Sequence, residues 1–351
     1  SRKNVTSMIN NFQQLPTILS NIFKESLSVA LPLYRIIIPM IIVVKILKEI
    51  GAVEILGQWM APLMGLVGLP GSMGLVWAAT LVAGFYPGIF IFADLAATEM
   101  LTVGQVTILS SLMLIAHSLP IELQIAGKAG SRWLSMGIIR VGGALLYGMI
   151  LNQILLWGNW LSESSILLWH PETGPVSVLT WASEQTVGLI IMFVILVFLV
   201  QFMKLLDLIG LTKLLQRILH PLLRNLGIGK EATNITIIGI TLGIAYGGGL
   251  IIRESRTGTI PPRDIFFALV LMGLFHSFVE DTLLLMLLGG NLWGYLVGRW
   301  IFALLVVWLL VRILSLLSDQ QFHRYFFKEK TVTQPGPLDY ESTKDAKRLA
   351  G

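Results

Sequence analysis

The sequence predicts an all-α polytopic membrane protein made of two inverted repeats, each with three spanning helices and one re-entrant hairpin, plus short amphipathic helices. Composition is the first observation: of 351 residues, 55% are hydrophobic and 13% are charged, whereas a soluble domain has about 25% charged residues. The second is that several apolar runs approach the ~20 residues that a helix needs to cross a bilayer. The third is a residue pattern that recurs at a constant offset of 159 positions.

The repeated pattern contains two interrupted apolar segments in each half. GFYPG at 84–88 precedes LIAHSLPIE at 114–122, and LGIAYGGG at 242–249 precedes LFHSFVED at 274–281. The offset also pairs Ile50 with Ile209, Gly51 with Gly210, Leu56 with Leu215, Pro62 with Pro221, Gly68 with Gly227, Gly84 with Gly243, Gly88 with Gly247, His117 with His276, Ser118 with Ser277 and Arg140 with Arg299. One ungapped register from residue 50 to at least 140 predicts an internal duplication, whose period is too long for a solenoid unit. Transporters built from two halves carry such interruptions in matching places, near the substrate site.

The first half begins with an amphipathic segment, 1–27, which we expect to lie on the membrane surface. The first repeat, 28–157, is predicted to contain a span at 28–47, a short helix at 52–66, an apolar segment at 72–100 broken by GFYPG, a span at 103–131 broken at 117–120, and a span at 134–157. Residues 1–24 are polar and lack the apolar core of a cleavable signal peptide.

The second half repeats this plan after a polar, extracytoplasmic linker at 158–185. The second repeat, 186–317, is predicted to contain a span at 186–206, a short helix at 211–226, a segment at 232–257 broken at 243–249, a span at 262–289 broken at 276–277, and a span at 294–317. Residues 318–351 are polar and contain Pro335 and Pro337, which predicts a disordered cytoplasmic tail.

The positions of Lys and Arg predict the topology, because cytoplasmic loops carry the excess of both. Basic residues gather at 1–24, 128–132, 204–230, 253–263 and 312–330, and are scarce at 51–71, 92–102, 157–185 and 289–293. Eight simple spans cannot satisfy this distribution. Re-entrant hairpins at 72–100 and 232–257, the first entering from outside and the second from the cytoplasm, do satisfy it and place both termini in the cytoplasm of a bacterial inner membrane. Lys45 and Lys48, at the outer end of the first span, go against the rule.

The interruptions predict where a site would lie. Non-helical backbone at membrane depth occurs only where protein or a water-filled cavity satisfies its polar groups, and glycine permits the positive φ of a tight turn. We therefore expect the two hairpin tips and the two broken helices to meet near the midplane and line one cavity. The helix ends exposed there suit a polar solute or an ion.

A hairpin followed by a broken helix, twice, resembles the nucleoside-recognition ("Gate") family. That family includes the YjiH-like and spore-maturation A/B-like membrane proteins and the membrane part of ferrous-iron transporter B. It is distantly similar to the concentrative nucleoside transporters, whose substrate site lies between two hairpins and two unwound helices. The resemblance covers about 28–157 and 186–317 through GFYPG, the glycines of 242–249 and the two His-Ser breaks. It implies a nucleoside-like solute.

His117 and His276 occupy equivalent positions in the two breaks and are followed by carboxylates at Glu122, Glu280 and Asp281. Ionisable groups inside spans are costly and mark functional pathways by default; here they could bind a substrate, a proton or a cation. In the structural interpretation, each His instead satisfies a carbonyl at its helix break and the carboxylates pair with Arg140 and Arg299. The candidate substrate-binding residues are Gly84, Tyr86, Gly88, His117, Ser118, Glu122, Arg140, Gly243, Tyr246, Gly247, His276, Ser277, Glu280, Asp281 and Arg299.

Four charged residues have two interpretations each. Arg140 and Arg299 lie five to seven residues into their spans, where they could bind an anionic solute or counter the midplane carboxylates, or could extend to the lipid headgroups. Asp94 and Arg253, equivalent in position and opposite in charge, could form external and internal gates or be ordinary loop-edge charges.

The predicted function is transport of a small polar solute by alternating access. The alternatives are a divalent metal-ion permease using His117, His276, Glu122 and Asp281, or a non-transport factor in membrane assembly or lipid handling.

An enzyme is not expected, because neither an acid/base pair beside a nucleophile nor a phosphate loop after a strand is present. With no cysteines, we expect no thiolate cofactor site; a coupling ion, H+ or Na+, stays open. The expected partners are the bilayer and the solute, with no nucleic acid; a homo-oligomer stays open.

Overall fold

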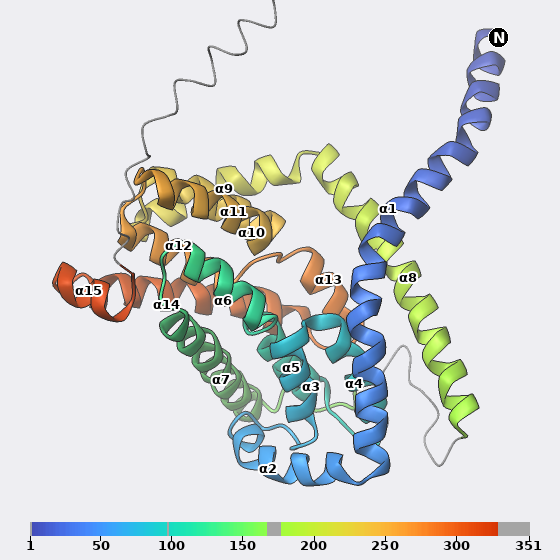
Figure 1. Ribbon diagram of the computed structural model, residues 1–351, viewed down its shortest axis with the longest axis horizontal. Helices are drawn as coiled ribbons and strands as arrows, with labels where there is room; N and C mark the ends of the chain where they lie inside the picture. The colour runs from blue at the N-terminus through green and yellow to red at the C-terminus, as the bar shows by residue number, and fades with distance from the viewer. Residues whose placement is uncertain (1, 97, 167–176, 329–351) are drawn as a thin grey trace, which may run out of the picture.

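The structure is a computed structural model that describes residues 2–96, 98–166 and 177–328 (Figure 1). The described part of the chain is all-helical apart from loops and two isolated β-bridges. The first half contains α1 (Arg2–Glu49), α2 (Ala52–Leu66), α3 (Met73–Ala83), α4 (Phe85–Ala96), α5 (Val103–Ile115), α6 (Leu119–Lys128) and α7 (Trp133–Gly158). The second contains α8 (Val178–Leu208), α9 (Leu211–Asn225), α10 (Lys230–Leu242), α11 (Ile244–Thr257), α12 (Pro262–Leu274), α13 (Glu280–Met286), a π-helical turn η1 (Trp293–Gly298), α14 (Arg299–Leu314) and α15 (Asp319–Tyr325).

Five helical segments in the described residues are long and apolar enough to cross a membrane: Ala30–Glu49, Val103–Lys128, Trp133–Gly158, Val178–Leu206 and Trp293–Leu314. Large apolar side chains on α1, α7, α8 and α14, among them Ile36, Ile138, Val194 and Leu305, are exposed, as lipid-facing side chains are. Most of the Val103–Lys128 segment is instead buried, so α5 and α6 lie at the centre of the protein. The predicted membrane-protein class is confirmed. The predicted span at 262–289 is divided between α12 and the short α13.

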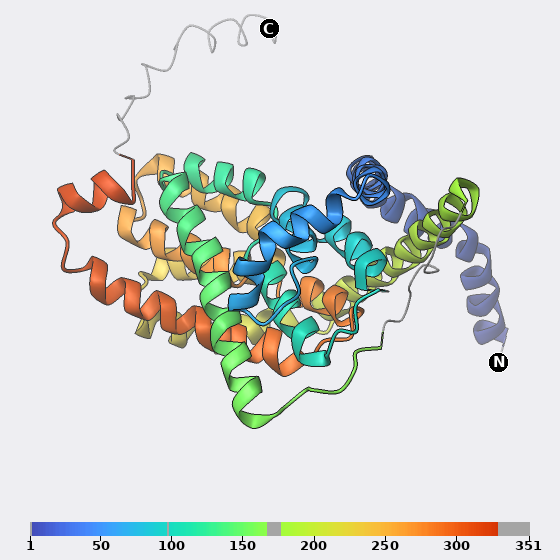
Figure 2. The ribbon, with the colours of Figure 1, turned by 90° about the horizontal axis from the view of Figure 1, so that it is seen from below.

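Elements related by the 159-residue offset make matching contacts. The pairs α3–α4 and α10–α11 each pack arm against arm, α2 packs on α3 as α9 packs on α10, and α1 packs along α8. At the centre, α5 contacts α7 and η1, while α12 contacts α14 and α7. Figures 1 and 2 show these central helices surrounded by α2 and α9 at opposite ends and by α1 and α8 along one side.

The four predicted interruptions all occur. The arms α3 and α4 are separated by Gly84 alone, with φ +95°, and α10 and α11 by Gly243 alone, with φ +96°. The breaks after α5 and α12 contain Ser118 and Ser277, whose φ values of +46° and +43° are unusual for side chains other than Asn or Asp. Equivalent positions therefore share the same rare backbone conformations.

Three helix boundaries differ from those expected, while the membrane-surface location of 1–27 stays a prediction and residues 329–351 of the expected tail lie outside the described residues. The segment 1–27 and the first span form one continuous helix, α1, whose N-terminal part extends away from the other helices (Figures 1 and 2). The second hairpin is interrupted at Gly243 only, and α11 continues through Gly249. The tail does not become irregular at 318: a capping box between Ser318 and Gln321 starts α15, and Phe322 and Phe327 are buried.

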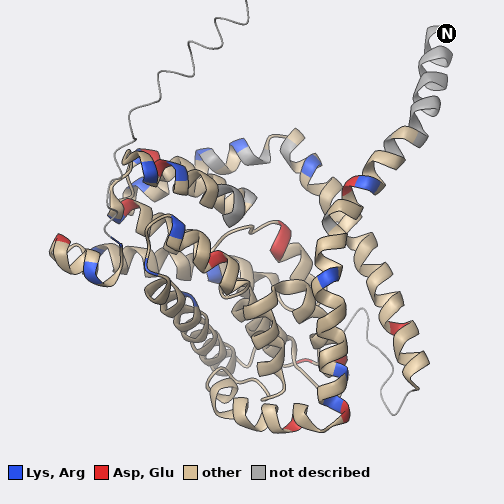
Figure 3. Ribbon diagram, viewed as in Figure 1, with Lys and Arg blue, Asp and Glu red and all other residues tan. Residues whose placement is uncertain are grey.

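Charged residues are unevenly distributed (Figure 3). Lys and Arg occur along α9, α10 and α11, at the upper side of that view, whereas α2, at the lower side, contains none. The basic Lys48, which goes against the positive-inside rule, has a local explanation, because its Nζ lies 3.0 Å from the carboxylate of Asp94.

Candidate functional site

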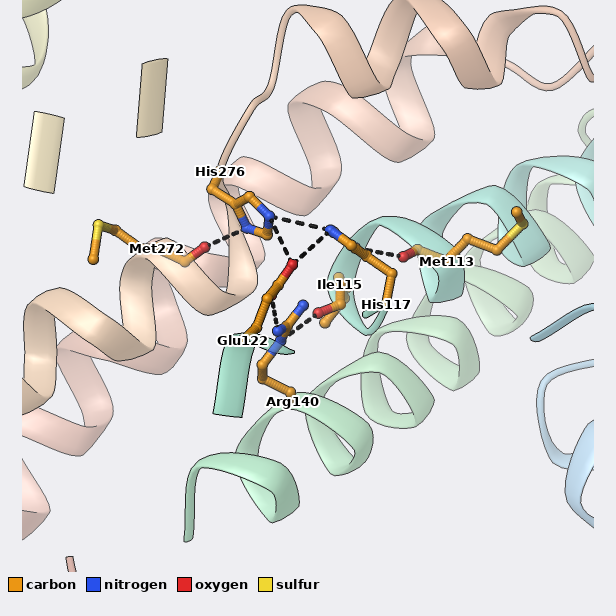
Figure 4. A network of polar contacts seen from close by, with 7 residues as sticks. All are labelled: Met113, Ile115, His117, Glu122, Arg140, Met272 and His276. Atoms are coloured by element: carbon orange, nitrogen blue, oxygen red, sulfur yellow. Dashed lines mark hydrogen bonds and ion pairs between the residues drawn. The ribbon is translucent and has the colours of Figure 1, made fainter. Parts of the chain in front are cut away.

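The candidate site lies where the two broken helices meet (Figure 4). His117 follows the last turn of α5 and His276 follows the last turn of α12, while Glu122 lies in the first turn of α6. Arg140 reaches the same point from α7. Their exposed fractions are 4% for His117, 3% for His276, 5% for Glu122 and 1% for Arg140, so the cluster is closed off from its surroundings in this conformation.

Three atoms of this cluster lie close together. The Nε2 atoms of His117 and His276 are 3.1 Å apart. Oε1 of Glu122 lies 3.1 Å from Nε2 of His117 and 3.5 Å from Nε2 of His276. The two histidines are thus brought together with the carboxylate of the first half.

The opposite side of each imidazole bonds to the backbone. Nδ1 of His117 lies 3.0 Å from the carbonyl of Met113, and Nδ1 of His276 lies 2.6 Å from the carbonyl of Met272. A carbonyl only accepts, so this geometry assigns a proton to each Nδ1. Each ring therefore donates a hydrogen bond to a carbonyl in the last turn of α5 or α12, which was the structural role considered for these histidines. The Nε2 atom of each ring still faces the cluster.

Arg140 holds Glu122 in place. Its Nη1 donates to Oε2 of Glu122, and its Nε donates to the carbonyl of Ile115 at the end of α5, 3.1 Å away. Space for the guanidinium stem depends on Gly273, because a Cβ there would lie 3.2 Å from Cδ of Arg140. The predicted pairing of a midplane carboxylate with an arginine is therefore present in the first half.

The equivalent pair in the second half is not formed. Asp281 and Arg299 share no hydrogen bond or ion pair in the described structure, and Nε, Nη1 and Nη2 of the fully buried Arg299 have no hydrogen-bond partner. The guanidinium lies instead 4.5 Å from the ring centroid of Phe275. A carboxylate oxygen of Asp281 and one ring nitrogen each of His117 and His276 all lie within 4.8 Å of one another.

The hairpin tips contact the breaks. A Cβ on Gly84 would lie 2.8 Å from Oγ of Ser118, and one on Gly243 would lie 2.6 Å from Oγ of Ser277. The amide of Ser118 also donates to the carbonyl of Thr80 in α3, 3.0 Å away. Each tip therefore contacts the break of its own half, and glycine is needed at both tips for space as well as for φ.

The remaining predicted residues have mixed positions. Gly88 lets α4 approach α3, since a Cβ there would lie 2.1 Å from Oγ1 of Thr80. Tyr86 and Glu280 are partly buried. The side-chain surroundings of Tyr246 and Gly247, in the first turn of α11, lie outside the described part of the structure.

Arg253 and Phe85 lie outside the set of candidate substrate-binding residues. Arg253 pairs with its neighbour Glu254 at the surface, as an ordinary loop-edge charge does. Phe85 was not among the candidate residues predicted from the sequence, yet its ring lies 4.0 Å from that of His117, centroid to centroid. Its place directly after the tip glycine was the available signal.

Comparison with known proteins supports the predicted family. Residues 30–132, from the second half of α1 to the loop after α6, match the Gate family, described as nucleoside recognition. An uncharacterized membrane protein of Bacillus subtilis (strain 168), YvoD, is 28% identical over 272 residues, which cover 76% of this chain and 85% of YvoD. No solved structure matches the chain significantly.

Proposed function

We propose that this membrane protein, which carries a Gate (nucleoside recognition) domain in its first half, is a transporter that moves a small polar solute by alternating access. In this proposal the two halves are inverted repeats, and α3–α4 and α10–α11 are re-entrant hairpins of opposite orientation. Both termini lie in the cytoplasm of a bacterial inner membrane. The proposal excludes an enzymatic role.

The observation that carries the proposal is the buried cluster at the meeting point of the halves. Each half contributes a histidine from a broken helix, and Glu122 and Arg140 complete the cluster from segments long and apolar enough to cross a membrane. Burying such groups in a membrane protein costs several kcal/mol, and they usually line pathways for substrates, ions or protons. A purely structural core could use apolar residues at these positions.

The backbone interruptions support alternating access. Four of them, at Gly84, Ser118, Gly243 and Ser277, surround the cluster. Discontinuous helices near the midplane expose helix ends to a substrate and separate segments that can move against each other. The hairpin tips close over the breaks in this structure, so the conformation fits an occluded state.

Transport can be tested with the purified protein reconstituted into liposomes. The panel contains nucleosides and nucleobases, which the family description suggests, and divalent cations, which the His and carboxylate groups suggest. We expect protein-dependent uptake of one of these classes. His117→Ala and His276→Ala should each reduce that uptake at least about tenfold, because each removes a pathway group.

The matched control is His220→Ala, which changes a histidine of α9 outside the cluster and should leave uptake unchanged. Wild-type uptake in the His117→Ala/His276→Ala double variant would contradict the proposed pathway. No protein-dependent uptake of any panel member, with the protein folded, would favour the assembly or lipid-handling role.

A further inference from the structure

The cluster contains three electron-pair donors with no hydrogen atom between them when both histidines are neutral. Because Nδ1 of each ring donates to a carbonyl, each Nε2 presents a lone pair. These lone pairs face each other at 3.1 Å, and both face Oε1 of Glu122. In a buried setting such an arrangement is repulsive unless a positive species lies among the three atoms.

We propose that His117, His276 and Glu122, with Asp281 as a fourth ligand, bind one divalent transition-metal ion. The binding site is inferred from the cluster itself. Only the further statement that the ion is the cargo rests on the proposed transport function.

The spacing of the ligand atoms fits a metal centre. Zinc binds His nitrogen and carboxylate oxygen at about 2.0–2.2 Å, which separates adjacent ligand atoms by about 3.0–3.5 Å in tetrahedral or octahedral geometry. The three observed separations, 3.1, 3.1 and 3.5 Å, fall in this range. A proton, the competing occupant, can satisfy one of these contacts well, whereas an ion at the centre satisfies all three.

The surroundings have the form of a second coordination shell. Metal-binding histidines donate their other N–H to a carbonyl or carboxylate, which fixes the tautomer and the ring orientation. Both histidines do so here, through Met113 and Met272. Arg140 bonds to Oε2 of Glu122 and leaves Oε1 directed at the two imidazoles, so the carboxylate is positioned for one-oxygen coordination.

Asp281 supplies the fourth group. It occupies the position equivalent to Glu122, and one of its carboxylate oxygens lies within 4.8 Å of a ring nitrogen of each histidine. No hydrogen bond in the described structure holds its side chain elsewhere, so a small rotation can bring it to the ion. Each half would then provide one histidine and one carboxylate.

The ligand set also defines the class of ion. Two imidazoles with carboxylates suit Zn²⁺, Co²⁺, Mn²⁺ or Fe²⁺, whereas Mg²⁺ and Ca²⁺ prefer all-oxygen sites. Arg140 and Arg299 oppose a cation, and the carboxylates of Glu122 and Asp281 offset them when both are ionised. The neutral imidazoles bind the ion without adding positive charge.

Binding can be measured on the full chain in detergent, without a polyhistidine tag and after removal of bound metal. Isothermal titration with Zn²⁺ and visible absorption with Co²⁺ are the two readouts, since the position and intensity of the Co²⁺ bands depend on the ligand atoms and on the coordination geometry. We expect one ion per chain, no competition from Mg²⁺, and at least about 100-fold weaker binding in His117→Ala and His276→Ala. Asp281→Asn should weaken binding by a smaller factor, and His220→Ala should not change it.

Two outcomes would overturn the site: a folded wild type that binds neither Zn²⁺ nor Co²⁺, or unchanged binding in the His117→Ala/His276→Ala double variant. If the alanine variants fail to fold, His117→Gln and the Co²⁺ spectrum of the wild type decide, because a spectrum without nitrogen ligands excludes the site. Zinc binding without zinc uptake into liposomes would retain the site and contradict its role as a transport site. Nucleoside uptake without metal binding would support the transport function and overturn the metal site.

Discussion

Arg140 and Arg299 occupy equivalent positions but have different surroundings. Arg140 pairs with Glu122 and bonds to the carbonyl of Ile115, whereas Arg299 is completely buried and has no hydrogen-bond partner on its guanidinium. Asp281 is one methylene shorter than Glu122, its equivalent, and does not reach Arg299 in this conformation. The same residue type therefore contributes differently to stability in the two halves.

This difference predicts that matched substitutions of the two arginines have unequal effects on the free energy of unfolding of the metal-free protein. Arg140→Met leaves Glu122 buried without its partner, and we expect a loss of about 3–5 kcal/mol in the free energy of unfolding. Arg299→Met removes a buried charge that has no hydrogen-bond partner and loses one cation–π contact with Phe275, and we expect a change within about 1 kcal/mol or a gain. Denaturant unfolding in detergent, followed by tryptophan fluorescence, measures both, and equal losses in the two variants would contradict this assignment.

At the scale of elements, the close approach of α11 to α6 depends on one glycine. A Cβ on Gly248 would lie 2.4 Å from Cγ2 of Ile125, whereas a Cβ on the next residue, Gly249, meets nothing within 4 Å. The two elements pack together, so the second hairpin is held against the broken helix of the first half at this position.

We expect Gly248→Val to destabilise the protein by about 1–3 kcal/mol, because the new side chain must push α11 away from α6. Gly249→Val is the matched control: it makes the same change of residue type in the same helix, with open space around it. Thermal unfolding of the two variants measures the difference. Similar melting temperatures for both would show that the α6–α11 contact is not tight.

The element boundaries show which sequence signals were sufficient. The helices α2 and α9 and all four interruptions were predicted, because amphipathic spacing, glycine and the His-Ser breaks act locally. The run of α11 through Gly247, Gly248 and Gly249 was not predicted, because a membrane helix tolerates glycine when its neighbours satisfy the backbone. The continuity of α1, which contains no glycine, was not predicted either. The ordering of α15 depends on distant contacts of Phe322 and Phe327.

The sequence was sufficient to predict the histidines and carboxylates of the buried cluster, but not which carboxylate pairs with an arginine. The duplication identified His117, His276 and the carboxylates, and hairpin geometry implied that they meet. Whether each arginine pairs with its carboxylate depends on side-chain length and on the conformation of each half, neither of which a repeat register contains. The ring of Phe85 against His117 likewise depends on how the tip is folded over the break.

At the scale of the whole molecule, the two halves share their elements but differ in one set of contacts. The first hairpin packs on α1 through α4, while the second packs through α11 on α6 of the other half. Among the described residues, the equivalent contacts of α11 with α8 and of α4 with α13 are at most weak. Two inverted halves of an alternating-access transporter are expected to differ in this way, because each adopts one of two conformations and they exchange during the cycle.

The proposed inversion of the two halves makes a prediction that needs no knowledge of the substrate. Met100 and Thr259 are equivalent by the 159-residue offset and are both exposed, in the loops after α4 and α11. The segment 253–263, from the end of α11 to the start of α12, carries Arg253, Arg256 and Arg263, while 92–102 contains no Lys or Arg. The positive-inside rule therefore places Thr259 in the cytoplasm and Met100 outside.

Because the chain has no cysteine, Met100→Cys and Thr259→Cys each introduce a single thiol, and the parent protein serves as the blank. We expect a membrane-impermeant maleimide to label Met100→Cys in intact cells and Thr259→Cys only after the cells are permeabilised. A parallel duplication would put both positions on the same side, so labelling of both variants in intact cells, or of neither, would contradict the inverted arrangement. Opposite labelling would support the inverted hairpins on which the alternating-access proposal depends, whatever the cargo.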